Sequence, residues 1–281
     1  MRVVDRITFK QAIKDICSSA HYELDTGLVK LLENSYKDEV SIIARDILQT
    51  IIENAQLAKV NSQPLCQDTG IGMFFIEMGE EILVEGGSAT KLINEAFREI
   101  YQEESFRKSV VREPLFARSN TGDNLPPIIH WDFVPGDRIK VYFLPKGAGA
   151  ENMSRLKMFH PLSDKNQLIE FVLDTVRRGG GNPCPPLLIG IGIGGSFDYV
   201  PILAKKALLR PIMEDNPDSR LTELEAEILT AVNNLGIGPM GLGGKTTALR
   251  VTIIQYPCHT ASLPVAINLQ CHSHRCKMII I

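Results

Sequence analysis

The 281-residue sequence has no apolar run long enough for a transmembrane helix and no block of Lys and Arg residues. Its formal net charge of −3 offers no basic surface of the kind that binds nucleic acid. The start of the chain lacks the apolar core of a secretory signal peptide. These absences argue against membrane-spanning and nucleic-acid-binding classes, and we expect a cytoplasmic protein.

The sequence also lacks C-x-x-C pairs, internal repeats and low-complexity linkers. Structural zinc sites typically use such close pairs, so their absence argues against one. In the cytosol, cysteines stay reduced and serve more often as ligands or catalysts than in disulfides. The composition, with 44% hydrophobic and 22% charged residues, is that of a globular protein with ample sequence for a core.

Helical periodicity dominates the first 60 residues. An apolar face near the N-terminus includes Cys17, which we therefore expect in the core. A longer apolar face covers residues 42–58 and ends before Pro64. A strand is expected over residues 72–78, followed by a helix that Ser88 can cap and that reaches about residue 107.

Strand patterns become frequent after about residue 125. Residues 128–134 and 138–144 flank Pro135-Gly136-Asp137, which predicts a hairpin. Further strands are expected over 187–193, 249–256 and 264–269, with helices after Ser163, from Pro201 and over 221–235. We expect a mixed α/β (α+β) fold in which a helical N-terminal part leads into a mixed-sheet part. Residues 1–281 would form a single domain with a soft boundary near residue 125.

The apolar tail Met278–Ile281 has two interpretations. It is either the last strand of the chain's own sheet or a contact with a partner polypeptide, because chain ends are usually solvated. The pattern of residues alone does not choose between them.

Three of the six cysteines occur in loops rather than on apolar faces. Cys66, Cys184 and Cys271 have Gly, Pro, Asp or His among their neighbours, and a metal-bound thiolate needs such an open backbone with donors nearby. Three sites so far apart in the sequence predict a shared cofactor with an incomplete set of protein ligands. The other three are expected to be bystanders: Cys17, Cys258 and Cys276.

Two glycine-rich segments partly match nucleotide-binding motifs. Gly190–Gly195 contains G-x-G-x-x-G after a strand, but residues 196–201 delay the next helix, which favours close backbone packing instead. Gly243-Gly244-Lys245-Thr246-Thr247 lacks the first glycine of a phosphate loop, because position 239 is Pro. A loop that presents Lys245 and two hydroxyls is still suited to holding an anion.

Taken together, these segments resemble the α part of the class I fumarase and L-tartrate dehydratase family of iron–sulfur hydro-lyases. The match runs in family order from about residue 60 to the C-terminus, and three cysteine loops in register make it specific. The matching segments are Cys66-Gln67-Asp68-Thr69-Gly70, Ser119-Asn120-Thr121-Gly122 with Asn124-Leu125-Pro126, Lys146-Gly147 with Gly149, Cys184-Pro185-Pro186, Gly194-Gly195, Gly243-Gly244-Lys245, and His259 with Cys271.

The resemblance implies a [4Fe–4S] cluster held by Cys66, Cys184 and Cys271, with the fourth iron open as a Lewis acid. It also implies two catalytic residues. Asp68 is similar to an acid/base at the leaving hydroxyl, although it can also simply cap the Asp-Thr-Gly turn. His259 is similar to the family's active-site histidine.

Residues that bind a small dicarboxylate are implied in the same way. Gln67 follows the first ligand, and Arg107 matches a carboxylate-binding arginine for which Arg112 is a competing choice. Gly149 is expected to offer its backbone amide to the substrate. Lys146, in the loop that closes the second hairpin strand, is suited to binding a carboxylate.

Single-chain members of the family carry a further C-terminal domain that completes the site, whereas this sequence stops after the third ligand. We therefore expect the α subunit of a hetero-oligomer with a separate β polypeptide, and the apolar tail then favours the partner contact. The leading hypothesis is reversible hydration of fumarate to malate, a reaction of the tricarboxylic acid cycle. The alternatives are an L-tartrate dehydratase α subunit, a non-catalytic iron–sulfur or zinc module and, third, a nucleotide-binding enzyme.

Overall fold

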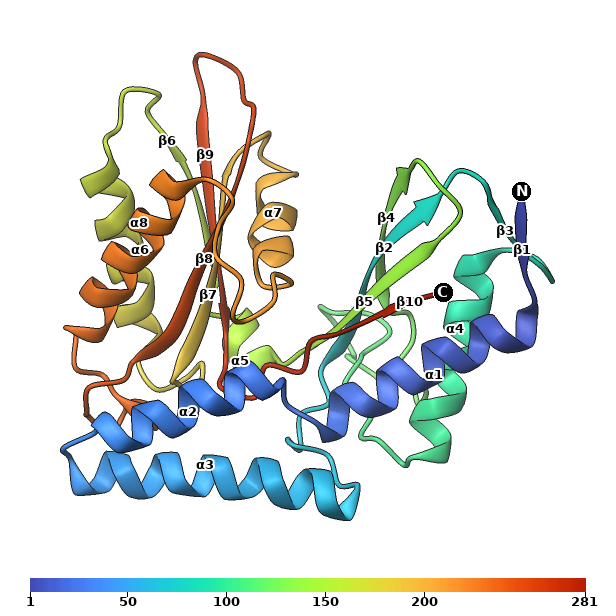
Figure 1. The fold of residues 1–281 in the computed structure, drawn as a ribbon, viewed down its shortest axis with the longest axis horizontal. Helices are drawn as coiled ribbons and strands as arrows, with labels where there is room; N and C mark the ends of the chain where they lie inside the picture. The colour runs from blue at the N-terminus through green and yellow to red at the C-terminus, as the bar shows by residue number, and fades with distance from the viewer. The chain divides into compact units, whose positions relative to one another are not determined.

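The computed structural model describes all 281 residues and divides them into two compact units. Unit 1 comprises Met1–Asp25, Ala55–Ala148 and Arg275–Ile281, and unit 2 comprises Thr26–Asn54 and Gly149–His274. Each unit contains a four-stranded mixed sheet with helices packed on it (Figure 1), so the expected mixed α/β fold is confirmed. No helix combines the length and the apolar composition needed to cross a membrane.

The sheet of unit 1 has the order β10-β5-β2-β4. Strand β2 lies at its centre, antiparallel to β5 and parallel to β4, and β10 is antiparallel to β5 at one edge. A separate parallel pair joins β1 to β3. The strands are β1 (Arg2–Val4), β2 (Ile71–Gly79), β3 (Ile82–Val84), β4 (Ile128–Val134), β5 (Ile139–Lys146) and β10 (Lys277–Ile280).

Helices α1 (Arg6–Tyr22) and α4 (Ala89–Glu103) form one core with strands β2 and β5. The carboxylate of Asp5 caps α1 by accepting hydrogen bonds from the amides of Ile7 and Thr8, both at 2.9 Å. Cys17 is fully buried on the apolar face of α1, as the periodicity predicts. Ser88 precedes α4 as expected but makes no side-chain cap bond.

The hairpin predicted around Pro135-Gly136-Asp137 is wrong. These residues do connect β4 to β5, but β2 lies between the two strands and pairs with both. The physical reason is burial: most of β2 is buried, so it requires a neighbour on each edge. Gly79 permits this crossing, because a Cβ there would lie 2.4 Å from the carbonyl oxygen of Gly136.

The C-terminal tail is the last strand of its own sheet, which is the first of the two interpretations. Strand β10 pairs with β5, and Ile139 and Ile281 exchange both backbone hydrogen bonds. Ile279 packs against the core of unit 1, whereas Met278 and Ile280 are about half exposed. The tail therefore has a partner within the chain.

The sheet of unit 2 has the order β6-β9-β7-β8, with β7 and β8 parallel and the other pairs antiparallel. Helices α6 and α8 cover one face and α7 covers the other (Figure 1). Helix α6 begins with a capping box between Asp164 and Gln167, one residue after the predicted Ser163. The strands are β6 (Arg155–Phe159), β7 (Leu187–Gly194), β8 (Ala248–Tyr256) and β9 (Leu263–Gln270).

The remaining helices connect these layers. Helix α3 begins and ends close to its predicted limits, and Gly180 and Gly236 follow α6 and α8 with positive φ angles, as expected for helix ends. The helices are α2 (Thr26–Asp38), α3 (Ile42–Asn61), α5 (Ala148–Glu151), α6 (Lys165–Gly179), α7 (Val200–Ala207), α8 (Ser219–Asn233) and the 3-10 turn η1 (Pro239–Gly241).

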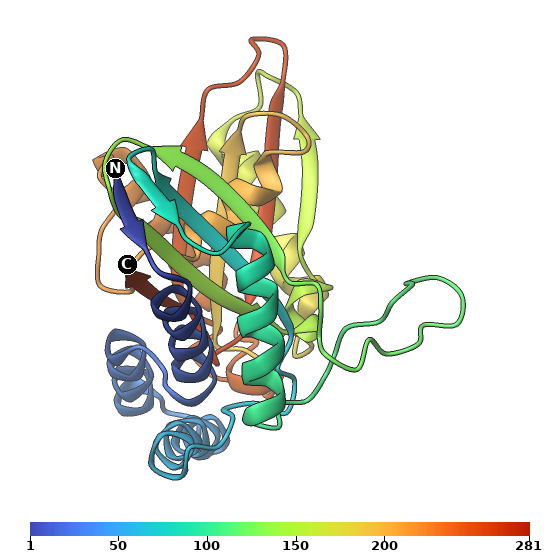
Figure 2. The same cartoon turned by 90° about the vertical axis from the view of Figure 1, so that its right-hand side faces the viewer.

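The segment between α4 and β4 contains no helix or strand and extends as a long loop (Figure 2, green). Backbone hydrogen bonds join Arg112 to Ser119 and Thr121 to Val110, so its two arms run antiparallel. Both ends of this loop contact the segment that carries Cys66 and Asp68, because Arg107 accepts a hydrogen bond from Thr69 and Asn124 donates one to Gly70.

Candidate active site

Asp68 is the best-positioned acidic side chain among the predicted site residues. Its Oδ1 accepts a hydrogen bond from the amide of Gly70 at 2.9 Å, and its Oδ2 accepts one from the amide of Ala148 at 2.9 Å. The hydroxyl of Ser109 lies 3.5 Å from Oδ1. The side chain is only partly buried, so its carboxylate is fixed in orientation while remaining accessible.

Asn124 holds the loop of Asp68 in place. It is fully buried, its side chain accepts from the amide of Ser109 at 2.6 Å, and it donates to the carbonyl oxygen of Gly70 at 3.1 Å. Thr69 makes a second hydrogen bond that holds this loop, since its hydroxyl donates to the carbonyl oxygen of Arg107 at 2.5 Å. Asn124 and Thr69 therefore fix the loop that carries Asp68.

The other predicted residues of unit 1 differ in exposure. Gln67 and Arg107 are exposed, although the backbone of Arg107 contacts Thr69. Lys146 is only 1% exposed, so it does not lie in an open charged loop as expected. Its backbone supports Asp68 indirectly, because a Cβ at Gly70 would lie 2.5 Å from the Lys146 carbonyl oxygen. Arg112 is exposed and donates to the carbonyl oxygen of Thr121 at 3.1 Å.

A buried guanidinium that sequence reasoning missed lies close to Asp68. Arg275 is 1% exposed, and a Cβ placed on Gly147 would lie 3.1 Å from Oδ2 of Asp68 and 3.9 Å from Nη2 of Arg275. The sequence signal was a charged residue just before an apolar strand, in a stretch dominated by Cys and His. Gly147 thus separates a carboxylate from a guanidinium.

A buried polar chain runs from α1 to the Asp68 loop. Nδ1 of His21 lies 2.7 Å from the carbonyl oxygen of Cys17, and Nε2 lies 3.2 Å from the hydroxyl of Tyr101. The same hydroxyl lies 3.3 Å from the carbonyl oxygen of Thr69, so its one proton faces two acceptors. Burial, followed by the charge of Arg275, lowers the pKa of His21 from 6.5 to about 4, so this imidazole is neutral.

The predicted ligands Cys184 and Cys271 lie at the same end of the sheet in unit 2. Cys184 precedes β7 and Cys271 follows β9, which is antiparallel to β7. The amide of His272 donates to the carbonyl oxygen of Cys184 at 3.3 Å, and its Nδ1 lies 3.0 Å from the same oxygen. Burial lowers the pKa of His272 despite the opposing bond to Cys184, which favours the neutral ring.

Cys184 adopts a left-handed backbone conformation with φ of 55°. Glycine adopts this conformation at least cost, so Cys184 holds a strained backbone of the kind often found at functional sites. The predicted Gly149 packs against the same loop, because its Cβ would lie 3.1 Å from the carbonyl oxygen of Asn182. Unit 2 therefore brings Gly149, Cys184 and Cys271 together, while Cys66 belongs to unit 1.

The thiols fit a thiolate-bound cofactor in their chemistry. All six cysteines are outside disulfides, and Cys66, Cys184 and Cys271 are partly exposed. By contrast, burial raises the pKa of Cys17 well above its usual value and that of Cys276 to about 12, so both are neutral thiols. Cys258 is exposed and not a buried bystander.

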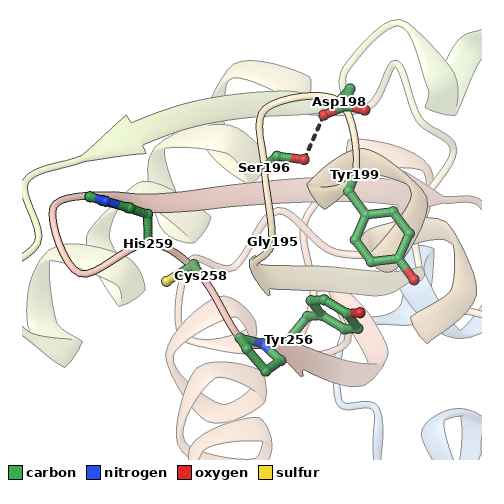
Figure 3. Close-up of a pocket in the computed structure, with 8 residues that line it drawn as sticks. Gly195, Ser196, Asp198, Tyr199, Tyr256, Cys258 and His259 are labelled. Atoms are coloured by element: carbon green, nitrogen blue, oxygen red, sulfur yellow. Dashed lines mark hydrogen bonds between the residues drawn. The ribbon is translucent and has the colours of Figure 1, made fainter.

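His259 lies in the loop between β8 and β9, where its Nδ1 accepts from the amide of Ala261 at 3.1 Å. It lines an open pocket of about 720 Å³ with Cys258 and Gly195 (Figure 3). Cys271 follows the other end of β9, and eight residues of strand place the two roughly 25 Å apart. The structure therefore does not bring His259 together with Cys184 and Cys271.

The two glycine-rich motifs have structural roles. Gly190 and Gly192 allow α7 to approach β7, because their Cβ atoms would lie 2.2 Å from the carbonyl oxygen of Ala204 and 2.4 Å from that of Val200. The expected close packing is thus present.

The loop of Gly243-Gly244-Lys245 does hold an anion, but that anion is Glu39 of the same unit. The amide of Lys245 donates to Oε2 of Glu39 at 2.7 Å, and the amides of Val40 and Ser41 donate to Oε1. Burial raises the pKa of Glu39, but these backbone bonds outweigh it and lower the pKa.

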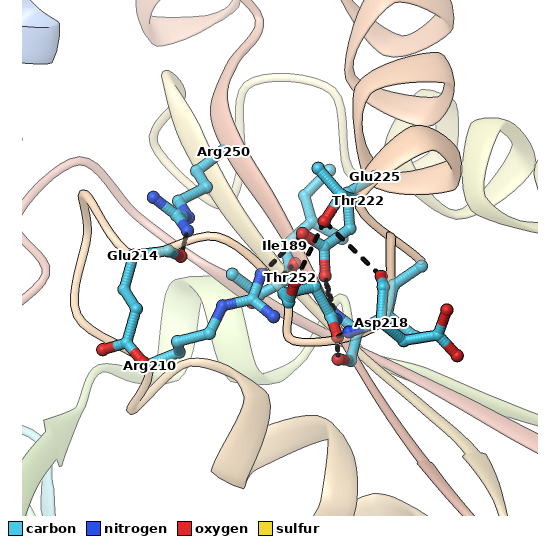
Figure 4. A network of polar contacts seen from close by, with 10 residues as sticks. Ile189, Arg210, Glu214, Asp218, Thr222, Glu225, Arg250 and Thr252 are labelled. Carbon is cyan, nitrogen blue, oxygen red and sulfur yellow. Dashed lines mark hydrogen bonds and ion pairs between the residues drawn. The ribbon is translucent and has the colours of Figure 1, made fainter. Parts of the chain in front are cut away.

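A second polar cluster in unit 2 surrounds Glu225 (Figure 4). Its carboxylate accepts from Nη2 of Arg210 at 2.6 Å, from the side chain of Asn216 at 2.8 Å and from the amide of Ile253 at 2.7 Å. Glu225 is thus fully partnered within the protein, and we attribute a structural role to this cluster.

Comparisons with known proteins agree with these observations. The family model for fumarate hydratase (Fumerase) matches residues 10–279. A Methanocaldococcus jannaschii protein named "Putative L(+)-tartrate dehydratase subunit alpha" is 45% identical over 270 residues, which cover 94% of each chain. The L(+)-tartrate dehydratase subunit alpha of Escherichia coli K12 is 31% identical over 280 residues, covering 98% of this chain and 90% of the relative.

Proposed function

The chain belongs to the fumarate hydratase family of hydro-lyases, and we propose that it is the α subunit of a two-subunit enzyme that reversibly hydrates fumarate to malate. The observation that carries this proposal is the carboxylate of Asp68, which two backbone amides fix beside the buried guanidinium of Arg275. Such a group is suited to moving a proton at a defined position.

We assign the cofactor from the three loop cysteines. Cys66, Cys184 and Cys271 would hold a [4Fe–4S] cluster, and when bound it would supply an open iron that acts as a Lewis acid toward the substrate hydroxyl. The partly exposed thiols and the left-handed backbone of Cys184 support this ligand set.

Asp68 is the residue to which we assign the proton transfer at the leaving hydroxyl. In the dehydration direction, its carboxyl gives the oxygen a proton as the C–O bond breaks and water leaves. In hydration, its carboxylate takes that proton back. The amides of Gly70 and Ala148 keep the group in one orientation during both directions.

The neighbours of Asp68 would bind the dicarboxylate. Gln67 and Arg107 are exposed and adjacent to its loop, and Gly149 would offer its amide near the Cys184 loop. The backbone of Lys146 packs closely against Gly70 in the Asp68 loop. Because its side chain is buried, Lys146 is a weaker candidate for direct contact with the substrate. His259 lies far from Cys271, and we give it no step in the proton transfer.

We propose further that a separate β polypeptide completes the enzyme in the cytoplasm and supplies the base for the C–H proton. The names of the relatives, each a subunit alpha, support a hetero-oligomer. The absence of disulfides among six cysteines agrees with a reducing compartment.

L(+)-tartrate dehydration is the second candidate, because the relatives at 31–45% identity carry that name. Tartrate differs from malate by one further hydroxyl, so the same proton transfer by Asp68 would serve both. The difference in specificity would then depend on contacts to the second hydroxyl.

The test is to co-express the chain with its β polypeptide, reconstitute the complex anaerobically with iron and sulfide, and measure turnover of fumarate, malate and L(+)-tartrate. Turnover of fumarate supports the first candidate, and turnover of tartrate alone supports the second. Cys66→Ser, Cys184→Ser and Cys271→Ser should each lose the cluster, whereas the control Cys17→Ser should retain it. Bound zinc, or a cluster without turnover of any of the three acids, would instead indicate a non-catalytic module.

A further inference from the structure

Arg275 is the largest side chain that is fully buried in the chain. Its Nε and Nη1 atoms donate no hydrogen bond, although both are shielded from water. An unsatisfied buried donor is destabilising, and more so when the group is charged. Such a group calls for an explanation, and a ligand bound in the working state is one.

The pairing of strands explains why Arg275 lies beside Asp68. Lys277 of β10 is opposite Phe143 of β5, so the residues just before β10 and just after β5 meet at the same end of the sheet. Gly147 follows β5, and the nearest atoms to its missing side chain belong to Asp68 and Arg275 alone. The two charged groups therefore border one small space.

The charge of Arg275 is not neutralised by an ion pair. This charge acts on two buried neighbours. Burial is the main cause that lowers the pKa of His21, and the charge of Arg275 is the second cause. Burial raises the pKa of Tyr101, and the charge of Arg275 opposes that rise. His21 is held neutral, so it does not repel the guanidinium. Asp68 and Arg275 are the charged residues whose atoms lie nearest to a Cβ placed on Gly147.

We propose that Arg275 binds a carboxylate of the substrate and thereby orients the hydroxyl of the same molecule toward Asp68. This inference rests on the proposed hydro-lyase function. A guanidinium is planar and always charged, and its N–H donors match the geometry of a carboxylate. Nη2 is the atom of Arg275 that lies nearest to a Cβ placed on Gly147, beside Asp68, and Nε and Nη1 lack partners, so the guanidinium offers donors that match a carboxylate.

A structural arginine in the same protein looks different. Arg210 is less deeply buried, with 12% of its side chain exposed, and although its Nε also has no hydrogen-bond partner, its Nη2 donates to the carboxylate of Glu225 at 2.6 Å (Figure 4). Arg107, the arginine expected to bind a carboxylate, is exposed. Among these three, Arg275 alone is almost fully buried without a carboxylate partner and lies next to Asp68.

The experiment uses the reconstituted α/β complex and the non-reacting dicarboxylate succinate as a probe. Calorimetry gives the Kd for succinate, steady-state kinetics give KM and kcat for fumarate or tartrate, and iron analysis reports the cluster. The variants are Arg275→Gln, which removes the charge, and Arg275→Lys, which keeps the charge but loses the planar donors. Arg210→Lys is the matched control in a paired arginine.

We expect Arg275→Gln to raise the succinate Kd and the substrate KM by about tenfold to a hundredfold, with unchanged iron content, because a bond to a charged group contributes that factor. Arg275→Lys should lie between this variant and the wild type. Arg210→Lys should lower thermal stability without changing Kd. If Arg275→Gln does not fold, Arg275→Lys alone carries the comparison.

Two outcomes overturn the inference. An unchanged Kd in Arg275→Lys and Arg275→Gln would show that the guanidinium does not bind the carboxylate. Both variants could instead lose iron while the fraction that keeps its cluster binds succinate with the wild-type Kd. That result would assign Arg275 to holding the cluster loops. If wild-type complex binds succinate through Arg275 but turns over none of the candidate acids, the inference stands and the proposed function fails.

Discussion

Two loops of this protein hold a carboxylate with backbone amides, and they differ in what surrounds it. In unit 2, Glu39 is 3% exposed and accepts hydrogen bonds from the backbone amides of Val40, Ser41 and Lys245. In unit 1, Asp68 is partly exposed and lies close to Arg275, whose buried Nε and Nη1 atoms have no hydrogen-bond partner. Both sequences contain glycine beside a charged residue, so that pattern alone does not identify a site. The candidate site is marked instead by a buried guanidinium that lacks hydrogen-bond partners and lies beside an accessible carboxylate.

The largest effect that separates the two loops is expected at Asp68. Asp68→Asn keeps an oxygen that can accept from one of the two amides but can no longer transfer a proton. We expect kcat of the α/β complex to fall by about 10²- to 10⁴-fold, while the free energy of unfolding changes by less than about 1 kcal/mol. Steady-state kinetics and thermal unfolding check this. A normal kcat would reduce Asp68 to a turn cap like the carboxylate of Asp5.

Acid should destabilise unit 1 through His21. Its folded pKa of about 4 is below the usual 6.5, so the unfolded chain takes up the proton first. The stability that this neutral residue contributes is present above pH 6.5 and is lost as the pH falls toward 4, by roughly 3 kcal/mol at most. Urea unfolding at several pH values measures the loss. Arg275→Gln, which removes one cause of the shift, should shrink it, and an equal loss in that variant would contradict the assignment.

Glu39→Gln should affect stability and leave catalysis unchanged. The amide group would place an NH₂ against backbone donors that now share a carboxylate, so at least one buried N–H loses its acceptor. We expect the free energy of unfolding to fall by about 1–3 kcal/mol. Chemical denaturation gives this value, and kcat per folded complex should match that of the wild type. A selective loss of kcat would mean that the loop of Lys245 is catalytic after all.

The smallest effect is expected at Lys245. Its exposed ammonium donates only to the carbonyl oxygen of Asp38, whereas the bond to Glu39 comes from its backbone amide. Lys245→Met should therefore change stability by no more than about 0.5 kcal/mol and leave substrate KM unaltered. A large rise in KM would identify Lys245 as an anion-binding side chain.

Local patterns predicted most elements of this fold. The periodicity of α1 placed Cys17 in the core, and the continuous apolar run of β7 identified a buried strand. The hairpin prediction failed because β2, more than 40 residues earlier in the sequence, separates β4 from β5. Turn residues describe the connection between neighbours in sequence, and pairing across such separations is set by burial of the whole sheet.

In the candidate site, too, local sequence patterns identify some residues, whereas others become visible only through long-range strand pairing. Asp68 and the cysteine loops are visible because their residue types are unusual in loops, but Arg275 is not. An arginine in a sequence normally indicates a solvated surface, and only the pairing of β10 with β5 reveals that this one is buried. His259 shows the converse: it is only twelve residues from Cys271 in the sequence, but the extended strand β9 between them places the two at opposite ends.

The carboxylate of Glu39 also competes with dissolved anions for the loop of Lys245. It is tethered to the loop that it occupies, so its effective concentration there is on the order of millimolar or higher whatever the solvent contains. Free phosphate or a nucleotide would have to displace a ligand that never diffuses away. The loop of Lys245 is in this sense a receptor permanently occupied by its own chain, and dissolved anions in the cell have little access to it.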